Sequence, residues 1–182
     1  MSLLEEEFRQ LVMAAVAERA AANGGVISRA ELSALVLANG ETRRVIDTSK
    51  GIWNPRDLVA TLSIVSSPTG PYDDRHVEGG LFHYDYRAGS TEGDNTKLRR
   101  AFELGLPIIF LRNIGNGSYV LALPTYVVAD DLDNHQSVLA LDDSLCFLPN
   151  PRPPSVAWQR FSRSSAPASP RHRNARGACT RP

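Results

Sequence analysis

The sequence predicts an α+β domain (α/β in the broad sense) in which a curved sheet or small β-barrel is flanked by helices. Between residues 41 and 141, short β-rich runs alternate with turns rich in Gly, Pro and Asn, and only one helical pattern interrupts them. Many short strands with few helices are typical of a strongly bent sheet. With 182 residues and 42% hydrophobic content, the chain is long enough to bury a proper core.

The first 40 residues are predicted to be a helical segment packed on that core. Residues 2–22 show the i, i+4 repeat of an amphipathic helix, which Ser2 can cap and Asn23-Gly24-Gly25 ends. The apolar positions that carry the repeat are Leu4, Phe8, Val12 and Val16.

A second, short helix is expected to begin at Ser28, because Glu31 three residues later completes a capping box. The two helices resemble a helix-turn-helix in outline, but the second offers one basic residue, Arg29, and no base-reading amide. We therefore interpret the segment as a packing or assembly element, and we expect any homodimer to form through it.

The core of the predicted domain, residues 41–148, consists of strands around a single helix. That helix spans residues 94–103, is capped by Asp94 or Asn95, and is stopped by Gly105. A turn over residues 51–55 is expected to bury Trp53 in the core. The predicted strands are residues 41–48, 62–65, 81–86, 107–111, 119–123, 126–129 and 138–141.

The charge is divided unevenly along the chain. Residues 149–182 hold seven of the 20 basic residues and none of the 20 acidic ones, so the preceding body carries 13 − 20 = −7 and the tail +7. This Pro-, Arg- and Ser-rich tail is predicted to be disordered. It could bind phosphate or fold over the acidic body. A truncated or out-of-frame end of a longer gene product is the alternative origin of its composition.

Composition also excludes several classes of protein. No apolar run reaches about 18 residues, so no membrane span is expected. The acidic start MSLLEEEF argues against a secretory signal and for a cytoplasmic protein. Cys146 and Cys179 form neither a metal-ligand pattern nor a disulfide framework, and no cofactor is indicated.

The stretch from Gly70 to Asn113 combines aromatic residues and carboxylates with glycines. Aromatic rings can cover the faces of a nucleobase, a carboxylate can accept a hydrogen bond from its exocyclic amine, and glycines let the backbone approach its edge. A β-hairpin with ordinary strand tyrosines and a solvated acidic turn is the alternative interpretation.

The order of motifs in and around this stretch resembles the SRA domain, the module that flips 5-methylcytosine out of DNA. The resemblance covers about residues 50–130. The motifs, in family order, are Gly51-Ile52, Ser63-Ile64-Val65, Gly70-Pro71-Tyr72-Asp73-Asp74, Phe82-His83-Tyr84, Asn95-Thr96-Lys97-Leu98 and Leu111-Arg112-Asn113.

The resemblance implies a PUA-like barrel and a pocket for a flipped, modified cytosine. It implies that Tyr72 and Tyr84 sandwich the base. It also implies that Asp74 accepts hydrogen bonds from the pairing edge, with Asp73 as the fallback because the spacing after Tyr72 is one residue shorter here. The implied partner is DNA that contains 5-methylcytosine.

Two departures from the family pattern affect specificity. Asp85, Tyr86 and Arg87 stand where the family lines the methyl pocket with small residues, and Asp85 could face a polar group such as a hydroxymethyl. The loop RAGSTEGD lacks the long basic finger of eukaryotic members, so we expect little reading of flanking sequence. The candidates for phosphate contacts are Arg75, Arg87, Lys97, Arg99 and Arg100.

The resemblance extends to bacterial modification-dependent restriction enzymes, in which an SRA-like domain is joined to an HNH nuclease. This chain has no HNH pattern, and its four histidines are too scattered to bind a metal. The sequence therefore predicts a non-catalytic reader, or the front part of such a nuclease. The alternatives are a PUA- or ASCH-like protein that binds RNA or a nucleotide, and a partner-binding module with a degenerate pocket.

The break in composition at Pro149 generates a first prediction. Limited proteolysis should remove the tail and leave a stable core of about the first 150 residues, because exposed unpacked chain is cut first. Mass spectrometry of the digest measures the boundary. A full-length chain that resists the protease would contradict the prediction.

Overall fold

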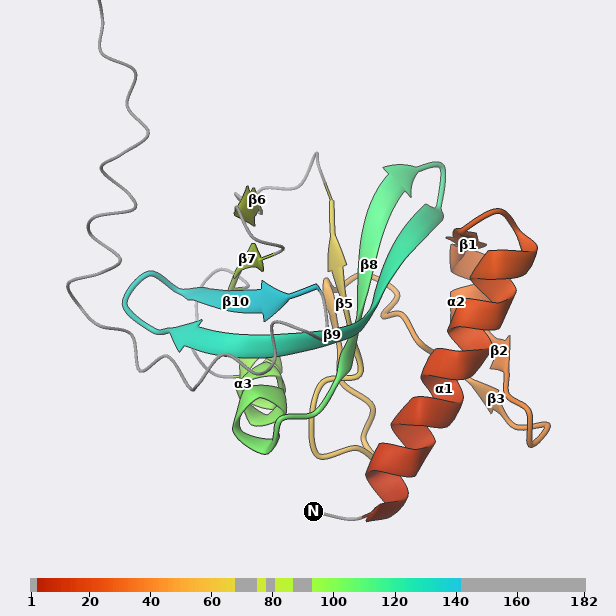
Figure 1. The fold of residues 1–182 in the computed structure, drawn as a ribbon, viewed down its shortest axis with the longest axis horizontal. Coiled ribbons are helices and arrows are strands. Elements are labelled where there is room, and N and C mark those ends of the chain that lie inside the picture. Colours follow the sequence, from red (N-terminus) through yellow and green to blue (C-terminus); the bar gives the residue numbers. More distant parts are fainter. Residues whose placement is uncertain (1–2, 68–74, 78–80, 87–92, 142–182) are drawn as a thin grey trace, which may run out of the picture. The chain divides into compact units, whose positions relative to one another are not determined.

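The computed structural model describes residues 3–67, 75–77, 81–86 and 93–141, all of which belong to the compact unit Met1–Pro151. The predicted tail lies outside the described residues, so its state and its boundary at residue 149 remain predictions. Figure 1 shows the described helices and strands in place. They are α1 (Leu3–Ala22), β1 (Val26–Ser28), α2 (Arg29–Ser33), β2 (Leu35–Val36), β3 (Thr42–Arg43), β4 (Ile52–Trp53), β5 (Ser63–Ser66), β6 (Arg75–Val77), β7 (Leu81–Asp85), α3 (Asp94–Leu104), β8 (Ile108–Gly115), β9 (Ser118–Asp131) and β10 (Gln136–Ala140).

A mixed sheet runs in the order β4-β5-β8-β9-β10-β7-β6, and β1 pairs with β9 beside it. β5 and β8 are parallel, and the other neighbours in this sheet are antiparallel. In Figure 1, β5 and β8 run almost vertically, whereas β10 and the adjoining part of β9 run almost horizontally, so the sheet bends strongly between its two halves. The predicted fold class, a curved sheet flanked by helices with an N-terminal helical segment, is confirmed.

The turn between the two halves occurs within β9, a strand of 14 residues. Its first part pairs with β8 up to Thr125, and its second part pairs with β10 from Tyr126. Pro124 follows a cis peptide bond and lies opposite a register shift in β8. Because proline cannot donate to a ladder, it suits the point where β9 changes partners. The sequence pattern predicted two strands here, and the structure shows one.

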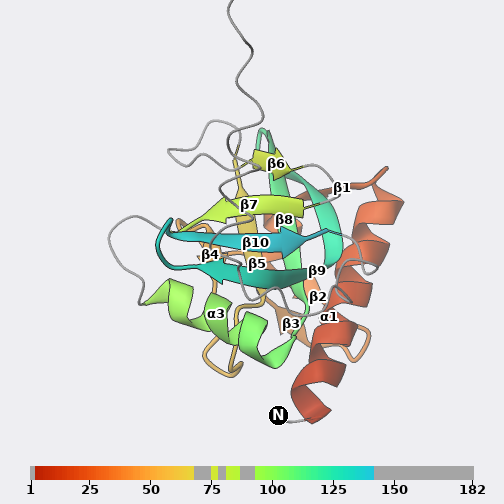
Figure 2. The same ribbon diagram turned by 60° about the vertical axis from the view of Figure 1, so that its left-hand side comes forward.

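Two hydrophobic cores lie on the sheet. One contains Val12 and Val16 of α1, Ile27 of β1 and Leu111 of β8. The other lies under α3, where Leu98 meets β7 and β8 and the rings of Phe82 and Phe110 stand 4.8 Å apart. Figure 2 shows α3 below β9, β10 and β7, with α1 standing at the side.

The segment 41–48 was predicted as a strand, and only Thr42–Arg43 forms one. Val45 and Ile46 are adjacent and both buried, and neither belongs to a strand. The Val45 N–H donates to the carbonyl of Leu32 rather than to a ladder, and the Ser63 hydroxyl bonds the Val45 carbonyl. The irregular backbone lets both side chains reach the core. The turn predicted at residues 51–55 likewise contains the short strand β4.

The helix signals at Ser28, Glu31 and Gly105 are confirmed, whereas the predicted Ser2 cap of α1 lies outside the described residues. Ser28 and Glu31 form the predicted capping box, and Gly105 ends α3 with φ of 61°. The N-cap of α3 is Gly93, which has no side-chain hydrogen bond, so the prediction of an Asp94 or Asn95 cap was wrong. Asn95 lies inside the first turn and is 2% exposed.

A buried ion pair fixes α1 to the sheet. The Arg9 guanidinium is fully buried and donates to Glu5 at 2.9 Å. Its remaining hydrogen bonds go to the carbonyls of Ala60, Thr61 and Pro107, at 2.8–2.9 Å. Glu5 also accepts from the Val59 N–H at 3.1 Å. Burial lowers the pKa of Arg9, and the hydrogen bond and charge of Glu5 oppose that shift.

Changing Arg9→Ala should lower the free energy of unfolding by about 3–5 kcal/mol, because the Glu5 carboxylate is left buried and uncompensated. Urea unfolding measures the loss. Adding Glu5→Leu should not restore stability, since the backbone groups of residues 59–61 and 107 would still lack partners. Arg19→Ala, on the exposed side of the same helix, is the matched control and should change stability by less than about 0.5 kcal/mol. We call the contacts of Arg9 with Glu5 and the three carbonyls the Arg9 clamp. An Arg9→Ala variant as stable as the control would contradict a stabilising role of this clamp.

Candidate functional site

The structure brings together four segments that the sequence analysis singled out. Ile52 of β4 pairs with Ile64 of β5. Ile64 and Val65 pair in parallel with Phe110 and Leu111 of β8. The Tyr84 hydroxyl reaches across from β7 to the Gly51 carbonyl, so residues separated by up to 60 positions in sequence meet around one end of β5.

Tyr84 is the central described residue of the predicted pocket. The alternation of β7 directs Phe82, Tyr84 and Tyr86 to one face, as predicted, and each is at most 5% exposed. The Tyr84 ring packs in the core under α3, and its hydroxyl donates to the Gly51 carbonyl at 3.3 Å. The ring is therefore fixed by core packing and by this hydrogen bond, and little of it is exposed.

Gly51 permits this approach because it has no side chain. A Cβ at this position would lie 2.9 Å from the Tyr84 hydroxyl oxygen and 3.4 Å from the Val65 carbonyl oxygen. The Gly51 carbonyl also accepts from the Val65 N–H at 2.7 Å. The glycine of the Gly-Ile motif thus serves close packing between β5 and β7 rather than an unusual backbone angle.

The opposite face of β7 carries a polar chain. The Gln136 amide donates to Asp85 at 2.6 Å, and its oxygen lies 3.1 Å from Nδ1 of His83. Asp85 therefore points away from the face that holds Tyr84. This placement does not suit the proposed contact of Asp85 with a substituent on a base that stacks on Tyr84.

Several predicted site residues lie outside the described part of the chain. They are Tyr72, Asp73, Asp74 and Arg87. The backbone of Arg75 belongs to β6 and pairs with His83 in β7, and its side chain is not described. β6 directly follows the segment of Tyr72–Asp74 and lies beside β7.

Of the predicted phosphate contacts, three lie on α3 and have protein partners, and Arg100 is one of them, paired with Glu103 on the same helix. The Lys97 ammonium donates to the carbonyls of Pro55 and Leu58 at 2.6 and 2.5 Å, which ties α3 to the loop before β5. Arg99 pairs with Asp130 of β9 at 2.7 Å. Burial raises the pKa of Asp130, and the neighbouring charge of Asp131 adds to this effect.

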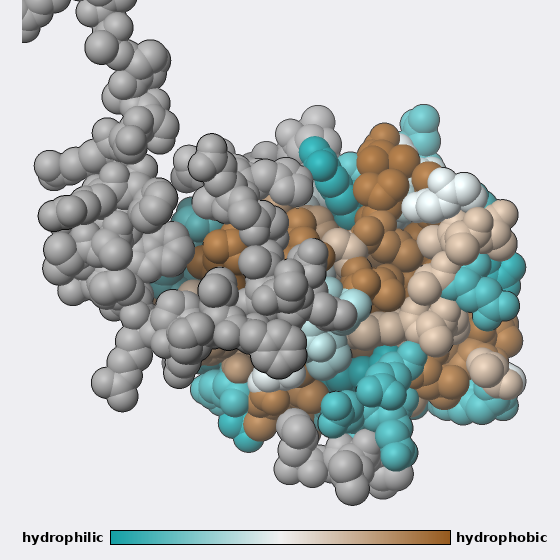
Figure 3. Space-filling view, in the orientation of Figure 1, coloured by the Kyte–Doolittle hydropathy of each residue, from teal (hydrophilic) through white to brown (hydrophobic). Residues whose placement is uncertain are grey.

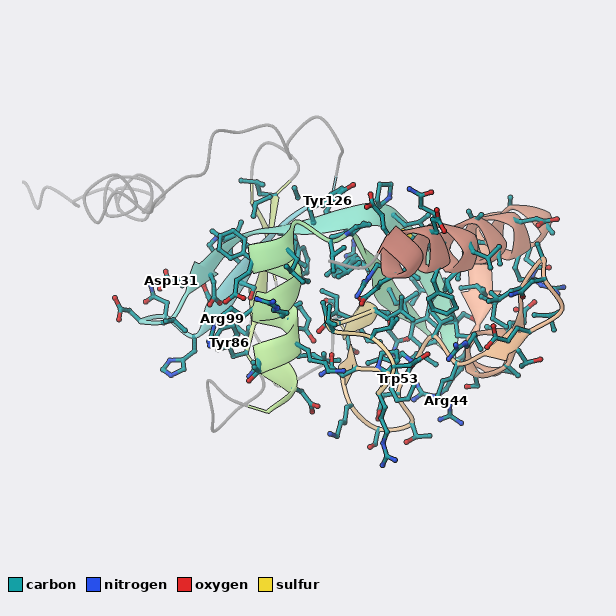
Figure 4. All side chains as sticks on the ribbon, turned by 90° about the horizontal axis from the view of Figure 1, so that it is seen from below. Arg44, Trp53, Tyr86, Arg99, Tyr126 and Asp131 are labelled. Carbon is teal, nitrogen blue, oxygen red and sulfur yellow. The ribbon has the colours of Figure 1, made fainter. Side chains whose placement is uncertain are left out.

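A row of buried polar residues beside Tyr84 was missed by the sequence analysis. Ser137 of β10 pairs with Tyr84 on one side and with Asp130 on the other, so the three side chains share one face. Among the described residues, three buried oxygens of this region find no hydrogen-bond partner, namely Ser137 Oγ, Asp130 Oδ1 and Tyr86 Oη. Figure 4 shows Tyr86 and Arg99 beside α3. No sequence signal identified the row, because Asp130 and Ser137 lie just beyond the predicted strands and the register is set by tertiary pairing.

The described residues contain no group of three or more His, Cys, Asp or Glu that could hold a metal ion. Within the same residues, no helix is both long and apolar enough to cross a bilayer. Figure 3 shows apolar surface over the upper end of the β8–β9 hairpin, where Ile114 is 52% exposed.

No protein-family model and no curated protein matches the chain. Among solved structures, the chain is similar to the SUVH5 SRA domain in complex with methylated CHH DNA, with a TM-score of 0.47 and 20% identity over 63% of this chain and 83% of that one. It is also similar to the SUVH5 SRA bound to fully hydroxymethylated CG DNA, with a TM-score of 0.40 and 19% identity over 52% and 75%. For KRYPTONITE in complex with mCHH DNA, an H3 peptide and SAH, the TM-score is 0.34 and the identity 14% over 50% and 26%.

The contact between Gly51 and Tyr84 generates a prediction about stability. Gly51→Ala should lower the free energy of unfolding by about 1–3 kcal/mol, because the new methyl group overlaps the Tyr84 hydroxyl. In a Tyr84→Phe background the same change should cost less, since the hydroxyl is gone. A double-mutant cycle by urea unfolding measures the coupling, expected at about 0.5–3 kcal/mol. Additive effects of the two changes would show that the residues do not meet.

Proposed function

We propose that this protein binds DNA containing modified cytosine, with 5-methylcytosine as the expected base, by flipping that base into a pocket between Tyr72 and Tyr84. Asp74 accepts hydrogen bonds from the pairing edge, and Asp73 is the alternative acceptor. In this proposal the protein is a reader with little dependence on flanking sequence.

The observation that carries the proposal is the convergence of the ordered motifs on one end of β5. Gly51 and Tyr84 are in contact, and Val65 bonds the Gly51 carbonyl beside the point where the chain continues toward Tyr72. These segments are far apart in sequence, and their agreement with the family order supports a shared site. The bond from the Tyr84 hydroxyl to the Gly51 carbonyl fixes the orientation of the ring, which supports a stacking role once neighbouring residues move off its face.

The chemistry follows from what a flipped cytosine loses and exposes. The base loses stacking worth a few kcal/mol, which two aromatic faces can restore. Its exocyclic amine needs a hydrogen-bond acceptor, which an ionised aspartate supplies. A thymine has a carbonyl oxygen at the same position, and the aspartate would repel it. Tyr84 lies packed at the edge of the core, so opening of the site requires movement of neighbouring residues rather than of this ring.

Phosphate contacts complete the proposal. Arg75 and Arg87 remain candidates, and Lys97 and Arg99 would have to exchange their partners in the loop before β5 and at Asp130. Arg100 is 51% exposed and pairs only locally with Glu103, three residues away on α3. Such contacts release counterions, so binding should weaken as salt rises.

The proposal also includes the biological context that the resemblance implies. We infer a non-catalytic role in the recognition of modified DNA, related to the reader part of bacterial restriction enzymes of the HNH type, in the cytoplasm. We also infer that any homodimer forms through the N-terminal helices. An RNA- or nucleotide-binding protein of the PUA or ASCH type would use the same pocket without a duplex, and the following experiment distinguishes it.

Fluorescence anisotropy with methylated duplex DNA, unmodified duplex DNA and RNA of the same sequence tests the proposal. We expect tighter binding to the methylated duplex, and Tyr72→Ala or Tyr84→Ala should remove about 1–3 kcal/mol of that binding. Phe at either position should be milder, because the ring face provides the stacking. Asp74→Ala should cost more than Asp74→Asn, since it leaves the amine unpaired in a closed pocket.

Thermal melting of each variant separates recognition from folding. Tyr84→Ala should also lower the melting temperature because the ring is buried, so Tyr84→Phe and Asp74→Asn are the variants that keep the test informative. All of these changes should spare the weaker, salt-sensitive binding to unmodified DNA. Equal affinity of the unaltered protein for methylated and unmodified duplexes would overturn the proposal.

A further inference from the structure

A hollow in the described structure, away from Tyr84, lies between α1 and the segment 42–57. Its volume is about 480 Å³, within the range of about 300–1,000 Å³ that is usual for small-molecule sites. The residues that the argument uses are Phe8, Arg43, Arg44, Trp53, Arg56 and Asp57.

The aromatic wall of this groove is held in place. The Trp53 indole donates from Nε1 to the Arg44 carbonyl at 2.9 Å, which fixes the orientation of its ring. Trp53 is only partly buried where it packs against the core beneath α1. Figure 4 shows Trp53 and Arg44 side by side on the same part of the molecule. The Phe8 ring is covered by the Arg43 guanidinium, 4.7 Å from its centroid, so Trp53 is the ring that a ligand can reach.

The groove is basic in an otherwise acidic body. Three arginines and one aspartate line it, a local charge of 3 − 1 = +2, whereas residues 1–148 together carry −7. Arg43 is compensated by Glu41 at 2.9 Å and Asp57 at 2.7 Å. Within the described residues, the exposed guanidinium groups of Arg44 and Arg56 make no ion pair and no hydrogen bond. Two cations therefore remain available beside a fixed indole.

Asp47 does not neutralise this pair. Its burial raises its pKa, but hydrogen bonds from the backbone of Ser49 and Lys50, and the charges of Lys50 and Arg44, lower the pKa overall. The carboxylate is thus satisfied by its own turn, at 2.8–2.9 Å from two N–H groups. Arg44 influences the Asp47 carboxylate through its charge alone, without a hydrogen bond. The guanidinium donors of Arg44 therefore have no partner among the described residues.

We propose that this groove binds an unpaired nucleotide of single-stranded DNA through stacking on Trp53 and phosphate contacts from Arg44 and Arg56. A positively charged groove with an aromatic platform is the general solution for binding single strands, because every base has a face that can stack. The site goes beyond the pocket for modified cytosine and does not depend on modification.

The probe is a fluorescein-labelled oligothymidylate of about twelve nucleotides, which contains no cytosine and so does not use the modified-base pocket. We expect the full chain to bind it. A plot of log K against log salt has a negative slope. The double variant Arg44→Ala/Arg56→Ala should make this slope shallower by about 1.4, which is about 0.7 for each phosphate contact on a single strand. The control is Arg19→Ala, which removes one positive charge from a helix side chain that is 51% exposed and should change the slope by much less than about 0.7.

A second measurement tests the stacking directly. In a Trp158→Phe background, Trp53 is the only tryptophan, and oligothymidylate should quench its fluorescence. Asp74→Asn should leave this binding unchanged while it reduces the preference for methylated duplex, so the two sites can be tested separately. The inference is overturned if the chain does not bind oligothymidylate, if Arg19→Ala reduces the salt dependence as much per charge removed as the double variant does, or if binding leaves Trp53 fluorescence unchanged.

Discussion

The packing of the whole unit depends on one buried guanidinium. Arg9 donates to the carbonyls of Ala60 and Thr61 in the loop before β5 and of Pro107, the residue before β8. β5 and β8 are the two parallel strands of the sheet. Five donors in a planar fork can serve several carbonyls and a carboxylate at once, which a lysine cannot do. The clamp joins the first turns of α1 to the ends of strands more than 50 residues away.

The loop before β5 is held from its other side by α3. Lys97 donates to the carbonyls of Pro55 and Leu58, and the Thr61 N–H donates to the Lys97 carbonyl. The loop is therefore fixed between two helices, and β4 and β5 extend from it. Gly51 and Trp53, one at each site proposed above, take their positions from this arrangement. Loss of the Arg9 clamp should for that reason weaken binding as well as folding.

The net charge of the body does not indicate which local surfaces of this chain are basic. A body charge of −7 opposes binding to DNA at long range, yet it does not decide what a local surface can bind. Most of the described cations on α3 and in the loops already serve carboxylates or carbonyls, as Lys97 and Arg99 do. Arg44 and Arg56 are exceptions in the part of the chain that the structure describes, which is why the groove beside Trp53 stands out.

The sequence by itself determined the helices of the chain, the alternation of β7 and the class of fold. These depend on local chemistry: the Ser28–Glu31 capping box, the glycine after α3, and the period of two that directs Phe82, Tyr84 and Tyr86 to one face. The ordered motifs also indicated Gly51 and Tyr84 before their contact was known. These features could be predicted because each is set within a few residues of chain.

Only the tertiary structure decided which residues meet. The single strand β9 was read as two, because the hydrophobic pattern breaks at Pro124 although pairing continues on both sides of it. Val45 and Ile46 are both buried because irregular backbone, bonded to Leu32, replaces a ladder. The row of Ser137 and Asp130 beside Tyr84 depends on strand register. Register and long-range pairing are set by the packing of distant segments, and no local pattern encodes them.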